Sequence, residues 1–163
     1  ITLTLIPIVV GSALYGWGSG AWLGFVFGVT VLLTGDANLF LAVNIPGTII
    51  TVILKGTLAG AAAGFVYKLI SKKNQIAAVI VSAVVAPVVN TGIFVLGSYV
   101  FFFDYLSGLA EGTNLFVFIL VGLVGINFFI ELGINLVLNP AILQIIRIGK
   151  KNFGGKNQII KTK

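Results

Sequence analysis

The chain has 163 residues, of which 58% are hydrophobic and only 9% charged, with a mean hydropathy of +1.15 and a net charge of +6. This composition is far from that of soluble proteins and predicts an integral membrane protein. Neither Cys nor His occurs, which excludes disulfides, thiol chemistry and the usual His or Cys metal sites from this segment, so we expect no metal and no cofactor.

Apolar segments of the length needed for membrane helices follow one another along the chain, since about 20 residues at 1.5 Å each cross the hydrocarbon core. Five spans are expected, at residues 1–15, 21–34, 48–70, 76–103 and 115–148. The last contains an Asn139-Pro140 break near its end. The sequence therefore predicts an all-α membrane protein with one transmembrane domain over residues 1–149 and a basic tail over residues 150–163.

Glycines recur at four-residue spacing in the second predicted span, at Gly20, Gly24 and Gly28, and again in the third. This spacing places small residues on one helix face and lets another backbone approach closely. The face packs either inside the protein or against a partner subunit.

The fourth predicted span carries Pro87, Asn90 and Thr91 in the middle of an uncharged apolar stretch. Proline removes a backbone donor and frees a carbonyl group, which neighbouring helices or a cavity must satisfy inside a bilayer. One interpretation is a packing kink with Asn90 bonded to another helix. The other is the polar wall of a ligand site.

Further polar side chains are expected at membrane depth: Lys55 in the third span, and Asn127, Glu131 and Asn135 at four-residue spacing in the fifth. Such residues are costly in hydrocarbon and mark sites or pathways by default. Lys55 can pair with an anionic ligand or with Glu131. Alternatively, Lys55 extends to the outer interface and Glu131 is neutral or bonded to an amide. A set of one cation, several amides and one carboxylate suits a small polar organic molecule better than a bare metal ion.

Charged residues at the ends of the spans and between them indicate the orientation. Most basic residues fall after the third span or at the C-terminus, on the side that the positive-inside rule assigns to the cytoplasm. They are Lys68, Lys72, Lys73, Arg147, Lys150, Lys151, Lys156, Lys161 and Lys163. Asp36, Asp104 and Glu111 fall on the opposite side. We therefore expect a cytoplasmic C-terminus, and we attribute the net charge of +6 to topology and not to binding of nucleic acid.

Catalysis finds little support in the sequence. No nucleophile accompanies a base in the manner of a catalytic triad, and no phosphate-cradling loop is present. We therefore expect a protein that is not an enzyme and does not itself hydrolyse ATP.

The order of several short motifs resembles the substrate-binding S component of energy-coupling factor (ECF) vitamin transporters. The motifs are Leu5-Ile6-Pro7-Ile8-Val9-Val10-Gly11, Tyr15-Gly16, Gly20-Ala21-Trp22-Leu23-Gly24, Lys55-Gly56-Thr57-Leu58-Ala59-Gly60, Ala86-Pro87-Val88-Val89-Asn90-Thr91 and Asn139-Pro140-Ala141. The resemblance covers nearly the whole chain. It implies a six-helix fold whose first helix, with its alanine-rich docking motif, is missing here.

The resemblance also implies a mechanism, in which an S component binds one micronutrient at an outward-facing site. It then associates with a transmembrane coupling subunit and two ATPase subunits in the bacterial plasma membrane, and topples to release the substrate inside. Substrate-binding positions and docking positions would correspond to two sets of residues. They are Asn44, Lys55, Asn90, Thr91, Asn127 and Glu131 for the vitamin, and Gly20, Gly24 and Gly28 for the coupling subunit.

The pattern is most similar to the pantothenate-type branch, and a carboxylate ligand would give Lys55 a partner. Hydroxyl and amide groups of pantothenate would match Asn90, Thr91 and Asn127. Folate, thiamine, riboflavin and pyrimidine precursors stay open as substrates, because sites in the family vary while the fold does not. A small channel and a purely structural membrane subunit are the alternatives outside this family.

Overall fold

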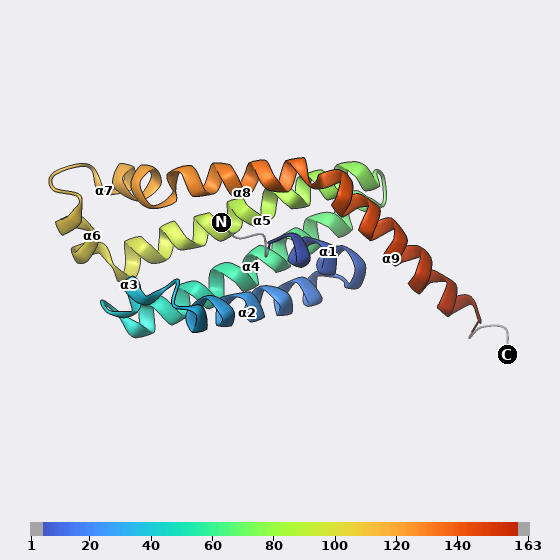
Figure 1. The fold of residues 1–163 in the computed structure, drawn as a ribbon, viewed down its shortest axis with the longest axis horizontal. Helices are drawn as coiled ribbons and strands as arrows, with labels where there is room; N and C mark the ends of the chain where they lie inside the picture. Colours follow the sequence, from blue (N-terminus) through green and yellow to red (C-terminus); the bar gives the residue numbers. More distant parts are fainter. Residues whose placement is uncertain (1–4, 160–163) are drawn as a thin grey trace.

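Helices make up nearly all of the computed structural model, which describes residues 5–159 apart from the side chains of Asn127 and of residues 152–159 (Figure 1). In chain order the elements are α1 (Leu5–Tyr15), α2 (Trp17–Thr34), α3 (Asn38–Leu41), α4 (Ile45–Ser71), α5 (Gln75–Phe101), α6 (Phe103–Leu109), α7 (Leu115–Val117), the π-helix η1 (Phe118–Val124), α8 (Gly125–Val137) and α9 (Asn139–Ile159). No strand occurs within the described range, which confirms the predicted all-α class.

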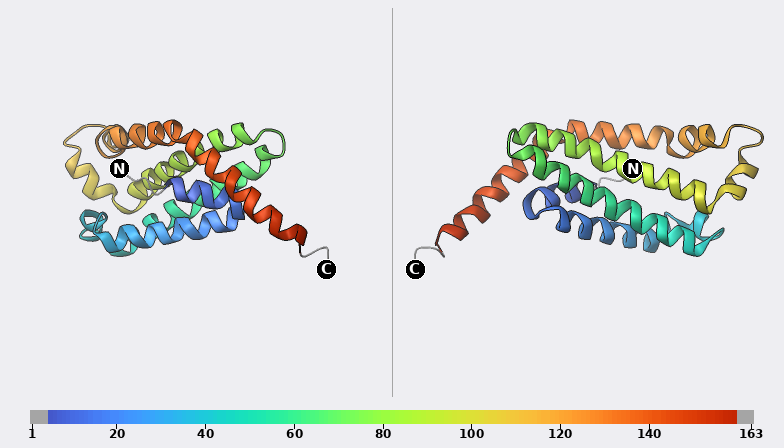
Figure 2. Two further views of the ribbon diagram at one scale, coloured as in Figure 1. Left: turned by 45° about the vertical axis from the view of Figure 1, so that its right-hand side comes forward. Right: turned by 180° about the vertical axis from the view of Figure 1, so that it is seen from behind.

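The long helices lie side by side along the longest axis of the molecule. Helix α4 packs between α2 and α5, and α8 packs against α5, while the short α1 contacts α2, α4 and α5 (Figure 1). Helix α9 packs on α1 and α5 with its first turns and then leaves the bundle at an angle, as all three ribbon views show (Figure 2). The predicted tail begins within this projecting helix.

The α2–α4 contact explains the glycine spacing. A Cβ atom on Gly20 would collide with the backbone carbonyl oxygen of Gly60, and one on Gly24 with that of Gly56. The two backbones therefore approach as closely as small residues allow. The structure places Gly20, Gly24 and Gly28 in this internal interface, where all three are buried.

Helix α4 begins at a well-defined cap. The side chain of Asn44 accepts a hydrogen bond of 2.9 Å from the Gly47 N–H, and Pro46 occupies the first turn, where its missing donor costs nothing. The amide nitrogen of Asn44 also donates to the Phe101 carbonyl group at 3.2 Å, which ties the start of α4 to the end of α5.

The fifth predicted span differs most from expectation. A single helix over residues 115–148 is wrong, because α7, η1, α8 and α9 share that range. The chain widens into a π-helix and breaks at Gly125, whose φ of 0° and ψ of −108° leave helical geometry, and the two halves meet at 47°. The expected break at Asn139 is confirmed as the start of α9.

Three described helices are long and apolar enough to cross a membrane: α2, α4 and α5. The bent pair at residues 115–124 and 128–137 qualifies as a fourth if it forms one span, and α1 is apolar but has only 11 residues. Large apolar side chains are exposed along these helices, such as Leu33 (82%) and Val137 (78%). The chain is thus an all-α, multi-pass membrane protein.

Candidate functional site

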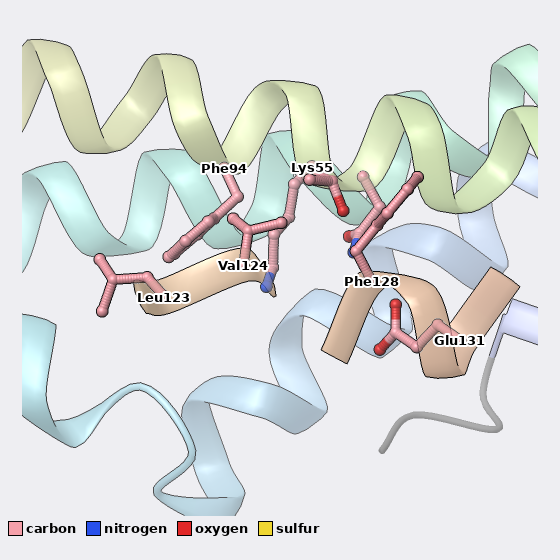
Figure 3. A pocket seen from close by; sticks show the side chains of 8 residues that line it. Lys55, Phe94, Leu123, Val124, Phe128 and Glu131 are labelled. Atoms are coloured by element: carbon pink, nitrogen blue, oxygen red, sulfur yellow. The ribbon is translucent and has the colours of Figure 1, made fainter. Parts of the chain in front are cut away.

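A polar cavity of about 170 Å³ lies between α4, α5 and the broken η1–α8 segment. Its walls combine charged, amide, hydroxyl and aromatic groups (Figure 3). The lining residues are Lys55, Asn90, Thr91, Phe94, Leu123, Val124, Phe128 and Glu131. The structure therefore brings together four of the predicted substrate-binding residues from three separate stretches of the chain.

Lys55 enters the cavity from α4, where its side chain is partly buried. Its ammonium nitrogen lies 5.4 Å from the centroid of the Phe94 ring, within the range of a cation–π interaction. In Figure 3 the Lys55 nitrogen points toward the break between Val124 and Phe128, and the Glu131 carboxylate points into the same space from α8.

The Glu131 carboxylate attracts the Lys55 ammonium group, but within the described residues no ion pair of 4 Å or less joins them. Lys55 therefore faces the cavity with hydrogen-bonding capacity unused. A ligand that places an anionic group between these side chains would meet a cation that is already partly desolvated.

Asn90 and Thr91 form the α5 side of the cavity. Asn90 is 9% exposed, and its Oδ1 atom is buried without a hydrogen-bond partner. A buried acceptor left unsatisfied costs about 1–3 kcal/mol, so a ligand that donates an N–H or O–H group here would recover that penalty. The alternative in which the Asn90 carbonyl oxygen is bonded to another helix is not seen in the described structure.

Two aromatic side chains, Phe94 and Phe128, also line the cavity, and they were not predicted from the sequence. Phe94 lies in an edge-to-face contact with Phe40 of α3, at 5.6 Å between ring centroids, and Phe40 contacts Phe102 in the same way at 5.0 Å. Phe94 lies one helical turn after Asn90, and Phe128 lies three residues before Glu131. Helical spacing from the predicted polar residues would therefore have identified both.

The other two predicted substrate residues, Asn44 and Asn127, are not among the residues that line the cavity in the described structure. Asn44 does not line the cavity, because its side chain caps α4 and holds Phe101. Asn127 belongs to α8, and its side chain lies outside the described residues. The glycines predicted for partner docking face α4 within the bundle.

The groups that line the cavity can donate and accept hydrogen bonds and can pair with charged groups. One cation, one carboxylate, one amide and one hydroxyl surround a volume smaller than the roughly 300–1,000 Å³ of sites for drug-sized ligands, which suits a compact polar metabolite or part of a larger one. Among the described residues no group of three or more His, Cys, Asp or Glu side chains is placed to hold a metal ion.

Comparison with known proteins identifies a family that the sequence matches. Residues 1–143 match the family model described as "ECF transporter, substrate-specific component". No curated protein and no solved structure matches the chain.

Proposed function

The chain belongs to the family of substrate-specific components of ECF transporters, and from this premise we propose that it is the high-affinity binding subunit of an importer for a water-soluble vitamin, with pantothenate as the substrate. The family consists of transport subunits, which supports a binding role and not a catalytic one for the cavity.

The observation that carries the proposal is the convergence of Lys55, Asn90 and Glu131 on one cavity. Pantothenate bears one carboxylate, which pairs with the Lys55 ammonium group. It also bears hydroxyl and amide donors, which satisfy the unpaired Asn90 Oδ1 atom and the Glu131 carboxylate. The small volume favours this compact molecule over folate and riboflavin, whose ring systems are larger.

The proposal extends to partners and orientation. The chain lacks a phosphate-cradling loop, so a transmembrane coupling subunit and two ATPase subunits would supply the energy for release. Lys72 and Lys73 lie between α4 and α5, at the opposite end of α4 from Asp36, which supports an outward-facing α2–α3 turn and a cytoplasmic C-terminus.

Calorimetry with a vitamin panel tests the function. The purified chain should bind pantothenate far more tightly than millimolar, and Lys55→Ala should weaken binding by about 10- to 150-fold, the value of a charge-assisted hydrogen bond. Lys68→Ala is the matched control, because Lys68 is an exposed cation on the same helix outside the cavity. Tight binding of another vitamin would overturn pantothenate alone. Binding of no vitamin would overturn the site and favour a structural subunit.

Orientation has its own test. Because the chain contains no Cys, single cysteines can be introduced without background. In sealed cells a membrane-impermeant thiol reagent should label Asp36→Cys and leave Lys72→Cys unlabelled. The reverse pattern would contradict the proposed topology.

A further inference from the structure

A second hollow lies away from the polar cavity, between the first turns of α5 and the junction of α8 with α9. Its volume is about 350 Å³, and its walls are mostly aliphatic. The lining residues, which we call the junction groove, are Ile76, Ile80, Leu136, Asn139, Pro140 and Leu143. Ile76 and Ile80 are 48% and 41% exposed, so the groove opens to the outside of the bundle, where a membrane-spanning chain meets acyl chains.

One polar side chain in this apolar groove lacks a partner. Asn139 is 8% exposed, and its Nδ2 donor is buried without a hydrogen bond. The Nε2 donor of Gln75, the residue before Ile76, is also buried and unpaired. Inside a membrane such donors are costly unless an acceptor reaches them. Only Asn139 of these two residues lines the groove, and a ligand that presents an oxygen acceptor next to a hydrocarbon chain would satisfy its donor and cover the aliphatic walls.

Charge at this end of the bundle specifies the ligand further. Lys72 and Lys73 directly precede the cap of α5 and are exposed, and among the described residues no carboxylate lies within 4.0 Å of either ammonium group. None of the four acidic residues of the chain lines the groove. Basic pockets between membrane helices at the interface are sites for anionic lipid headgroups.

We propose that the junction groove binds one phospholipid with an anionic headgroup. Its acyl chain lies against Ile76, Ile80 and Leu143, an ester or phosphate oxygen accepts a hydrogen bond from Asn139, and Lys72 and Lys73 contact the phosphate. The site joins α5 to the start of α9, so an occupied groove holds the α8–α9 junction in place. It does not depend on which substrate the polar cavity binds.

Native mass spectrometry of the full chain tests the lipid site directly. The detergent-purified protein is supplied with phosphatidylglycerol or with phosphatidylcholine of the same acyl chains. One phosphatidylglycerol should be retained preferentially, and a Lys72→Gln, Lys73→Gln double variant should lower its affinity by about fivefold per lysine. Lys151→Gln, which removes an exposed cation from the projecting part of α9, should leave retention unchanged. Equal retention of the two lipids, or equal loss in the control, would overturn the proposal.

A second measurement separates a lipid from a free anion. Phosphatidylglycerol should raise the unfolding temperature of the wild-type chain, whereas inorganic phosphate should not, and Asn139→Leu should abolish the lipid-dependent rise. Equal stabilisation by inorganic phosphate would show an ion site and overturn a lipid occupant. If Asn139→Leu does not fold, the exposed lysine double variant decides the question alone.

Discussion

The ammonium nitrogen of Lys55 lies 5.4 Å from the centroid of the Phe94 ring, so the aromatic face holds a cation at the wall of the polar cavity. Phe94 is itself fixed by its edge-to-face contact with Phe40. Phe40 belongs to the short helix α3 and does not line the cavity. It nevertheless helps to position Lys55, because it fixes the Phe94 ring that the ammonium group contacts.

Phe94→Leu should weaken pantothenate binding by about 2- to 30-fold, because a cation–π interaction at a partly desolvated site contributes about 0.5–2 kcal/mol and orients the ammonium group. Calorimetry on the variant measures the loss. Phe65→Leu is the matched control, since Phe65 is 56% exposed and lies outside the cavity. Unchanged affinity in Phe94→Leu would show that the Phe94 ring contributes hydrophobic packing and no cation–π interaction that matters for binding.

Asn90→Leu should change stability and affinity in opposite directions. The substitution removes a buried, unpaired carbonyl oxygen at similar side-chain size, so the unfolding temperature in detergent should stay equal or rise, while pantothenate affinity falls by about tenfold or more. Ser82→Ala offers a control on the same helix, because Ser82 is also buried with an unpaired hydroxyl but does not line the cavity. It should not affect binding. A parallel loss of stability and binding in Asn90→Leu would indicate that Asn90 supports the fold.

Sequence alone predicted the helices whose ends are marked by local features, such as capping residues and the end of an apolar run. Helix α4 spans residues 45–71 against a prediction of 48–70, and α5 spans 75–101 against 76–103, because the Asn44 and Asn74 caps and the loss of apolar residues mark their ends. Pro87 sits inside α5 without ending it. Polar residues in apolar spans likewise predicted four of the side chains that line the cavity, which are Lys55, Asn90, Thr91 and Glu131.

Other features depended on tertiary context. The π-helix before Gly125 leaves no local signal beyond a glycine, and several glycines of this chain, such as Gly56 and Gly60 in α4, lie within regular helices. Phe94 and Phe128 are of a residue type common in ordinary cores, so nothing in the sequence marked them as cavity residues apart from their helical spacing from Asn90 and Glu131. The glycine spacing predicted a close contact, but sequence alone left open whether α4 or another protein would fill it.

Gly24→Ala should destabilise the chain strongly, by about 1–3 kcal/mol or more, because the new methyl group meets the Gly56 backbone, which cannot rotate away. Gly92→Ala is the control: a methyl group on Gly92 in α5 would meet no atom within 4 Å, and alanine there should stabilise the helix by up to about 1 kcal/mol. Thermal unfolding in one detergent compares the pair. Similar unfolding temperatures for both variants would contradict close α2–α4 packing.

Asn44 caps the start of α4 in the structure, although the sequence predicts it at the substrate site. Asn44→Ala removes the acceptor for the Gly47 N–H and the donor to the Phe101 carbonyl group, so the free energy of unfolding should fall by about 0.5–2 kcal/mol while pantothenate affinity changes little. Asn44→Asp separates the two bonds, because aspartate still accepts from Gly47 but no longer donates to Phe101. It should recover part of the lost stability. Full stability with lost binding in both variants would instead return Asn44 to the substrate site, and would require the segment around it to move toward the cavity when the ligand binds.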